Sequence, residues 1–124
     1  MNFNKSNFKI CVVGLGYVGL PLAARLALKE FDVVGFDINE IRVQELCDNV
    51  DRNDDIDLTN LKILSQNSKL TSNSSDIKNC NIFIITVPTP INDDKTPNLG
   101  PIIASSKLIG SLMMKDSIII YEST

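Results

Sequence analysis

The chain has 124 residues, a formal net charge of −3 and 44% hydrophobic residues. This length suits one domain, and 22% charged residues argue against a disordered chain. An acidic protein lacks the basic surface that attracts nucleic acid or an anionic membrane, so we expect neither partner. The sequence contains no histidine, which excludes a Ser-His or Cys-His catalytic pair within it.

The first half of the chain alternates apolar strands with helices. Residues 8–14 form an unbroken apolar run that predicts a buried parallel strand. The pattern that follows predicts a helix over residues 17–30, whose inner side consists mainly of Val18, Leu22, Leu26 and Leu28. Further predicted elements are a strand over 32–37, a helix over 39–49 with Asn39 as its N-cap, a short helix over 58–65 and a weak strand over 69–71.

The second half repeats the pattern. A strand is predicted over 81–88, followed by a turn-rich loop and then a helix over about 99–114, which Asn98 caps. The predicted inner face of this helix consists of Leu99, Ile102, Ile103, Ile109 and Met113. A last strand is predicted over 117–124. This order predicts one α/β domain over residues 1–124, a Rossmann-type doubly wound parallel sheet of order 3-2-1-4-5 with helices on both faces.

The opening apolar stretch has a competing interpretation as an export signal. Lys5 and Lys9 precede an uncharged run, and the small-residue sequence "LAA" follows. However, glycines and Pro21 interrupt the run, and Arg25 ends it before it reaches transmembrane length. We therefore favour a strand, a turn and a helix.

The three cysteines, Cys11, Cys47 and Cys80, are far apart and form no CxxC pair. This spacing excludes the usual zinc sites, and the odd number fits a reducing compartment such as the cytoplasm. Cys11 lies in an apolar run and is expected to be a small buried residue.

The segment Gly14-Leu15-Gly16-Tyr17-Val18-Gly19 matches the pattern G-x-G-x-x-G between a predicted strand and a predicted helix. In that context Gly14 permits a tight turn, Gly16 lets the backbone approach a pyrophosphate, and Gly19 lets the helix pack closely on the strand. A glycine-rich turn without any ligand is the alternative.

The end of the second strand favours the dinucleotide interpretation. Asp37 lies about twenty residues beyond the glycines, where the motif expects an acid that accepts hydrogen bonds from the adenosine ribose. A carboxylate there would repel a 2′-phosphate, so NAD is favoured over NADP. Arg42 lies near the same edge, and some tolerance of NADP stays open.

The segment "DRNDDID" invites a calcium interpretation, because Asp51, Asn53 and Asp55 alternate as in an EF-hand loop. Ile56 stands where that loop needs glycine, and Lys62 stands where it needs glutamate. A solvated acidic loop is therefore expected, and no metal site is predicted.

Two strand ends place polar residues at the carboxyl edge of the sheet, where ligands bind in open α/β folds. The first is "VPTP", in which the Thr89 hydroxyl is placed to meet the cofactor. The second is "YEST", which brings Glu122, Ser123 and Thr124 to the same edge. The alternative for "VPTP" is a turn stiffened by its prolines, and the alternative for "YEST" is the start of a loop without a ligand.

Taken together, "KICVVGLGYVGLPLA", "VVGFDIN", "FIITVPTPIN" and "IIIYEST" resemble the N-terminal domain of the UDP-glucose/GDP-mannose dehydrogenase family. The "DR", "VPTPI" and "YEST" segments are most similar to its branch that oxidises UDP-N-acetylglucosamine or UDP-N-acetylgalactosamine at C6 for surface-polysaccharide synthesis. The resemblance implies oxidation of an alcohol to a carboxylate with two NAD molecules in turn, through a cysteine thiohemiacetal and thioester.

The resemblance also implies roles for individual residues. The pyrophosphate would be held by Gly14, Leu15, Gly16, Tyr17, Val18 and Gly19. The adenosine ribose would be held by Asp37, Ile38 and Arg42. The nicotinamide side would be lined by Val87, Pro88 and Thr89, with Ser123 and Thr124 also at the cofactor and Thr124 catalytic, positioning the reacting water or C6 oxygen.

The family pattern continues beyond the length of this chain, through a central dimer-forming helix and a sugar-nucleotide domain that holds the catalytic cysteine and lysine. None of the three cysteines here matches that position. We therefore expect the chain to be a fragment that alone binds NAD weakly or undetectably, is inactive, and belongs to a homodimer that binds a UDP-sugar. A UDP-glucose or GDP-mannose 6-dehydrogenase and a regulatory NAD-sensing module are the alternatives.

Overall fold

The computed structural model describes residues 4–122 and forms one parallel sheet within them. Its strands are β1 (Lys9–Val13), β2 (Asp32–Phe36), β3 (Lys69–Thr71), β4 (Ile82–Ile85) and β5 (Ile118–Tyr121). They are ordered β3-β2-β1-β4-β5, and every neighbouring pair is parallel. The predicted fold class and strand order are thus confirmed, including the weak strand β3.

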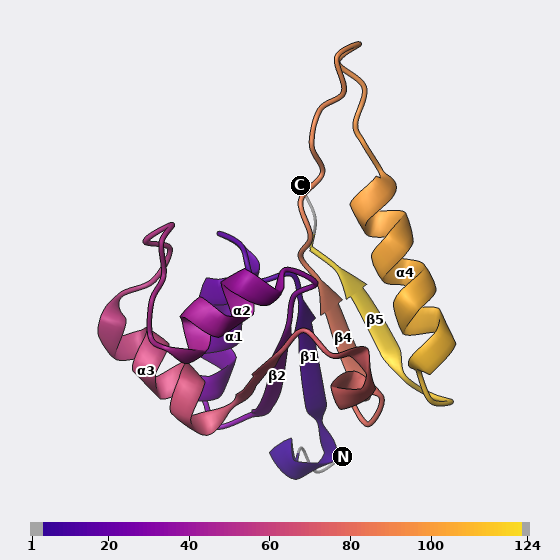
Figure 1. The fold of residues 1–124 in the computed structure, drawn as a ribbon. Coiled ribbons are helices and arrows are strands. Elements are labelled where there is room, and N and C mark those ends of the chain that lie inside the picture. Colours follow the sequence, from indigo (N-terminus) through magenta and orange to yellow (C-terminus); the bar gives the residue numbers. More distant parts are fainter. Residues whose placement is uncertain (1–3, 123–124) are drawn as a thin grey trace.

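The helices cover both faces of this sheet. They are α1 (Gly19–Leu28), α2 (Glu40–Cys47), α3 (Leu58–Asn67) and α4 (Gly100–Leu112), with short 3-10 turns η1 (Lys5–Asn7) and η2 (Ser74–Ile77). Figure 1 shows α1, α2 and α3 on one side of the sheet and α4 on the other. No helix in the described range is long and apolar enough to cross a membrane.

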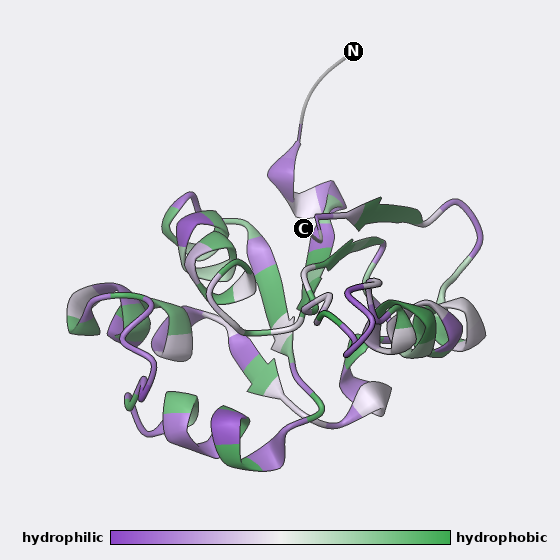
Figure 2. Ribbon diagram, turned by 90° about the horizontal axis from the view of Figure 1, so that it is seen from above, coloured by the Kyte–Doolittle hydropathy of each residue, from purple (hydrophilic) through white to green (hydrophobic). Residues whose placement is uncertain are grey.

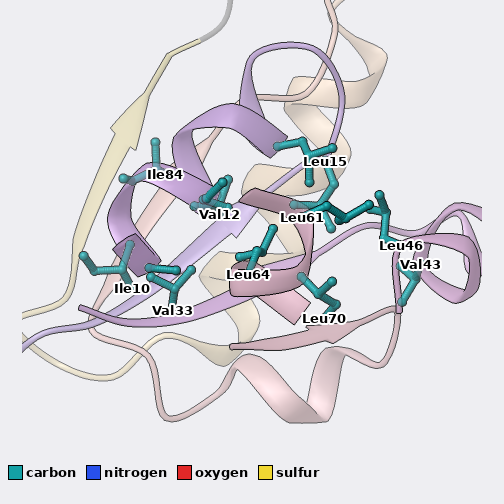
Figure 3. Packing of buried hydrophobic residues seen from close by; sticks show 14 residues of the cluster. Ile10, Val12, Leu15, Val33, Val43, Leu46, Leu61, Leu64, Leu70 and Ile84 are labelled. Carbon is teal, nitrogen blue, oxygen red and sulfur yellow. The ribbon is translucent and has the colours of Figure 1, made fainter. Parts of the chain in front are cut away.

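Alternation along the strands divides the core into two clusters. Ile10 and Val12 of β1 face α1, α2 and α3 in the larger cluster (Figure 3), which also contains Leu46, Leu61 and Leu64. Cys11 and Val13 face the other side, with Phe83, Ile85 and Ile109. The central strands are therefore buried on both faces, which explains their unbroken apolar sequence. In Figure 2 green covers much of the strands and parts of the helices, whereas many loop segments are purple.

The predicted N-cap of α2 is confirmed, whereas the predicted N-cap of α4 is wrong. The Asn39 side chain accepts a hydrogen bond from the backbone N–H of Arg42 and caps α2. Asp57 caps α3 in the same way. Asn98 accepts from the N–H of Gly100, although Leu99 occupies the cap position of α4.

The predicted inner faces of α1 and α4 are partly wrong. In α1 the buried residues are Gly19, Leu20, Ala23, Ala24 and Ala27, whereas Leu28 is 49% exposed. Small residues let this helix lie close to the sheet, which rotates the larger leucines toward its flanks. In α4 only Ile109 is fully buried, and Leu99, Ile103 and Met113 are exposed, because the helix packs on β4 and β5 through Leu108 and Leu112 instead.

Candidate functional site

A cavity of about 440 Å³ opens at the carboxyl edge of the sheet. It lies among the turn after β1, the end of β2, the start of α2, the segment after β4 and one side of α4. Its volume is that of an ordinary small-molecule site. Of the predicted site residues, those that line it are Gly14, Leu15, Gly16, Asp37, Ile38, Arg42, Val87 and Pro88.

The turn after β1 has a geometry that requires two of its three glycines, Gly14 and Gly19. Gly14 has a φ of 100°, a conformation that residues with a side chain rarely adopt. A Cβ on Gly16 would meet nothing within 4 Å. A Cβ on Gly19 would overlap the carbonyl oxygen of Gly14 and the hydroxyl of Thr86. One glycine therefore makes the turn, one leaves its outer surface open, and one allows α1 to pack.

The start of α1 is available to a ligand. Val18 occupies its N-cap position without a side-chain cap. Leu20 already donates its N–H to the Gly16 carbonyl oxygen at 2.9 Å and Pro21 has no N–H, so amide contacts with a ligand fall to residues 16–19. Such an N-terminus attracts the negative charge of a phosphate. Gly16 lines the adjoining cavity, and the turn can therefore receive a pyrophosphate at its open surface.

Thr86 is a residue of this turn that sequence reasoning missed. It directly follows β4, is buried, and donates its hydroxyl proton to the Gly14 carbonyl oxygen at 2.7 Å. The same hydroxyl lies 3.1 Å from the Val13 carbonyl oxygen. It therefore ties the turn after β1 to the end of β4. The sequence signal that could have indicated this role is a single polar residue, Thr86, directly after the apolar run of residues 82–85.

Asp37 holds the turn from the other side. Its Oδ2 accepts from the N–H of Leu15 at 2.9 Å, and its Oδ1 accepts from the N–H of Asn39 at 2.9 Å. Each carboxylate oxygen has a second lone pair, so these bonds leave acceptor capacity for ribose hydroxyls. The predicted contact with the ribose stays a prediction, but Asp37 does line the cavity.

Arg42 is buried and belongs to an ion cluster. Its Nε and Nη2 donate to the Leu15 carbonyl oxygen at 3.0 and 2.9 Å. Its Nη1 lies 2.7 Å from Asp51, and its Nη2 lies 3.3 Å from Asp55. The guanidinium thus joins the glycine turn to the segment after α2. Its predicted contact with the ribose also remains a prediction.

The expected solvated acidic loop is wrong for Asp51, whose side chain is only 5% exposed. Burial raises its pKa, but hydrogen bonds from Arg42 and from the backbone N–H groups of Ile56 and Asp55 outweigh that effect. The pKa of Asp51 therefore lies below its ordinary value. Among the described residues no cluster of acids, cysteines or histidines is arranged to hold a metal ion.

A second, smaller cavity of about 210 Å³ lies on the other side of the turn. It is lined by Tyr17, Val18, Thr86, Val87, Pro88, Thr89, Pro90 and Glu122. The Thr89 hydroxyl oxygen is buried and has no hydrogen-bond partner among the described residues. Such a group usually signals an additional partner. Ser123 and Thr124, the predicted reaction-side residues, lie outside the described residues.

None of the three cysteines lines either cavity. Cys11 and Cys80 are buried in the core, as predicted for Cys11, and Cys47 is exposed at the end of α2. A side-chain hydrogen bond with Cys80, together with burial, holds the pKa of the Cys11 thiol well above its usual range. These thiols are not placed for nucleophilic attack on a ligand at the carboxyl edge.

This sheet order, a glycine turn against an uncapped helix and an acid after β2 define a dinucleotide-binding domain of the Rossmann type. Residues 8–124 match the model of the NAD binding domain of the UDP-glucose/GDP-mannose dehydrogenase family. The chain belongs to that family, and NAD is the cofactor of this domain.

Relatives agree with this assignment. The chain is 48% identical to a UDP-N-acetyl-D-glucosamine 6-dehydrogenase of Pseudomonas aeruginosa, over 95% of this chain and 28% of that protein. It is 45% identical to protein CapL of Staphylococcus aureus, over 95% of this chain and 27% of that protein. The solved structure of a UDP-D-ManNAc dehydrogenase from Pyrococcus horikoshii superimposes with a TM-score of 0.84 at 34% identity, covering 94% of this chain and 28% of that one. The chain thus spans little more than a quarter of these relatives.

Proposed function

We propose that this chain is the NAD-binding part of a nucleotide-sugar 6-dehydrogenase that oxidises the C6 alcohol of a UDP-N-acetylhexosamine to a uronate. The observation that carries the proposal is the open glycine turn and Asp37 facing one cavity. The sugar class is supported by relatives named as UDP-N-acetyl-D-glucosamine 6-dehydrogenases at 48% and 45% identity. A UDP-glucose or GDP-mannose substrate is the second candidate, since the family name includes both.

The residues present fit NAD at both ends of the site. The turn amides and the start of α1 would hold the pyrophosphate, because a backbone without a Cβ at Gly16 can approach it closely. Asp37 would accept hydrogen bonds from the ribose hydroxyls with its remaining lone pairs. The unpartnered Thr89 hydroxyl and Glu122 would lie on the nicotinamide side. When bound, NAD supplies the hydride acceptor for the oxidation.

Titration of the ¹⁵N-labelled chain with NAD⁺ tests cofactor binding, since NMR detects affinities in the millimolar range. We expect amide shifts at Gly14, Gly16 and Asp37 that saturate. Asp37→Ala should weaken binding by about 1–3 kcal/mol, because ribose hydroxyls lose their acceptor. Glu40→Ala removes the same charge from an exposed position outside the cavity and should leave the affinity nearly unchanged. Because the isolated chain is expected to bind NAD⁺ weakly or undetectably, the titration is repeated on a protein with the length of the relatives; absence of NAD⁺ binding by that protein would contradict the proposal.

Activity is expected only from a longer protein that includes this chain. A protein with the length of the relatives should form NADH from a UDP-N-acetylhexosamine, and a panel of UDP- and GDP-sugars identifies the substrate. The 124-residue chain alone should not, because its cysteines lie away from both cavities. Steady NADH formation by the chain alone would contradict the expectation that catalysis needs the longer protein. We also propose a cytoplasmic homodimer for the longer protein, supported by the free cysteines and the family resemblance.

A further inference from the structure

Arg42 is the only cation among the described residues that line the cavity of about 440 Å³, where it lies with Asp37. In dinucleotide-binding domains an arginine near the adenosine ribose is the group that accommodates the 2′-phosphate of NADP. The sequence alone therefore leaves open whether Arg42 gives this site tolerance of NADP. The contacts of its guanidinium decide the question.

Four of the five N–H donors of this guanidinium are already used within the chain. Two bonds hold the Leu15 carbonyl oxygen, and one each goes to Asp51 and Asp55. The Arg42 side chain is only 8% exposed. To contact a 2′-phosphate fully, it would have to give up a carboxylate or the carbonyl that shapes the glycine turn.

Asp51 and Asp55 carry two negative charges, whereas the Arg42 guanidinium between them carries one positive charge. Asp51 and Asp55 are 5% and 13% exposed, so water screens their charge poorly. Asp51 is further fixed by the backbone N–H groups of Asp55 and Ile56, at 2.6 and 3.1 Å. The cluster is therefore held in place with a net negative charge next to the cavity, in addition to that of Asp37.

We propose that Asp51 and Asp55 determine the preference of this site for NAD over NADP, by holding the Arg42 guanidinium and cancelling its charge. They act through Arg42 and are positioning residues. Asp37 is then one of two reasons for NAD preference, and the segment after α2 supplies the other. The inference rests on the proposed function, because it concerns how the same cavity binds NAD.

The experiment compares the dissociation constants of NAD⁺ and NADP⁺ by NMR titration of the chain. Asp55→Asn is the first variant, because the hydrogen bond of the Asp55 side chain within the described residues is the 3.3 Å bond from Arg42. Asp51→Asn is the second, because Asp51 also orders backbone amides and we expect its loss to lower stability. Each variant loses one poorly screened charge, so we expect the ratio of the NADP⁺ dissociation constant to the NAD⁺ dissociation constant to fall. The expected fall is about three-fold in Asp55→Asn and about ten-fold in Asp51→Asn, because Asp51 lies closer to Arg42.

Two controls separate this effect from general damage. Asp93→Asn removes the same charge from an exposed loop residue outside the cavity and should leave the ratio unchanged. Arg42→Met combined with Asp55→Asn should abolish the gain in NADP⁺ affinity, because the released cation is gone. A merely structural defect would weaken both dinucleotides together and leave their ratio where it was.

The outcomes are distinguishable. A parent chain that binds NAD⁺, with an unchanged ratio in both aspartate variants, overturns this inference and leaves the proposed function standing. If the parent chain binds neither dinucleotide, the same comparison is made in a protein with the length of the relatives; if that protein also binds neither, the proposed function is contradicted and the inference falls with it. A lowered ratio that persists after Arg42→Met assigns the effect to general charge and also overturns the inference.

Discussion

At the scale of single residues, a methyl group added to two glycines of the same turn should have opposite effects. Gly19→Ala places its Cβ on the Gly14 carbonyl oxygen and the Thr86 hydroxyl, so α1 must move away from β1. Overpacking against backbone is expected to lower the free energy of unfolding by about 3 kcal/mol or more. Gly16→Ala meets open space and should change stability little, yet its Cβ would occupy the side that the pyrophosphate approaches.

Urea denaturation and NAD⁺ titration of both variants check this pair. Each variant is the control for the other, because the added group is the same and both positions belong to the same turn and helix start. Similar losses of stability in both would show that the turn does not distinguish packing from ligand approach. Unchanged NAD⁺ affinity in Gly16→Ala would argue against the pyrophosphate assignment.

Thr86→Val removes the hydroxyl that joins two strand ends. The Gly14 carbonyl oxygen loses its 2.7 Å donor in a buried place, so we expect a loss of about 1–3 kcal/mol in the free energy of unfolding. Thr59→Val, an exposed change on α3, should stay within about 0.5 kcal/mol of the parent. Urea denaturation measures both, and equal effects would show that the Thr86 hydroxyl does not stabilise the turn.

These residues also show what could be predicted at this scale. Glycine spacing and the position of Asp37 follow from rules of local backbone and chain order, and the structure has Gly14, Gly16 and Asp37 at the cavity; their contacts with NAD stay a prediction. Thr86 and Asp51 act through partners far away in the chain or through burial, and neither is visible in local spacing. Asp51 looked like part of a solvated loop because its partner Arg42 lies on the preceding helix, and only the fold shows that pair.

At the scale of elements, the segment after α2 is held to that helix by Asp51, and this contact should depend on pH. The folded pKa of Asp51 lies below its ordinary value of 3.8. Ionised Asp51 therefore contributes stability above that value, and the contribution is lost as the pH falls through the folded pKa. Asparagine does not titrate, so the stability gap between the parent and Asp51→Asn should be constant near neutral pH and shrink below about pH 4.

Urea unfolding at a series of pH values measures this gap. Other carboxyl groups with lowered pKa, those of Glu45, Asp76 and Asp94, titrate in both proteins and cancel in the difference. A gap that is the same at about pH 3 as at neutral pH would show that Asp51 is not stabilised as an anion.

Element positions were predicted more reliably than their packing faces. Strands and helices follow from apolar runs, caps and turn residues, and all of the predicted elements are present. Which side of α1 or α4 is buried depends on how each helix is rotated against the sheet. Small residues set that rotation in α1, and the place of α4 over β4 and β5 sets it there; neither follows from counting apolar residues.

At the scale of the whole molecule, the two faces of the sheet are unequally covered. The face under α1, α2 and α3 buries side chains from all three helices. On the other face α4 contributes one fully buried side chain, that of Ile109, and the residues of β5 are half-buried or exposed. Regions with little buried apolar surface open locally at a lower free energy than the core.

Native-state hydrogen exchange should therefore show α4 and β5 opening well below the global free energy of unfolding, with β1 and β2 exchanging only through global unfolding. Ile109→Ala should speed exchange in α4 and β5 while leaving the protection of β1 nearly unchanged. Leu64→Ala, on the better covered face, should instead lower the protection of β1 by about 2–5 kcal/mol. Equal loss of protection throughout the sheet in both variants would show that the molecule unfolds as one unit.

The contrast matters for the site, because α4 forms one side of the cavity next to Val87 and Pro88. If α4 opens alone, the glycine turn and Asp37 stay ordered while the α4 side of the same cavity moves, so one side of this cavity is more rigid than the other.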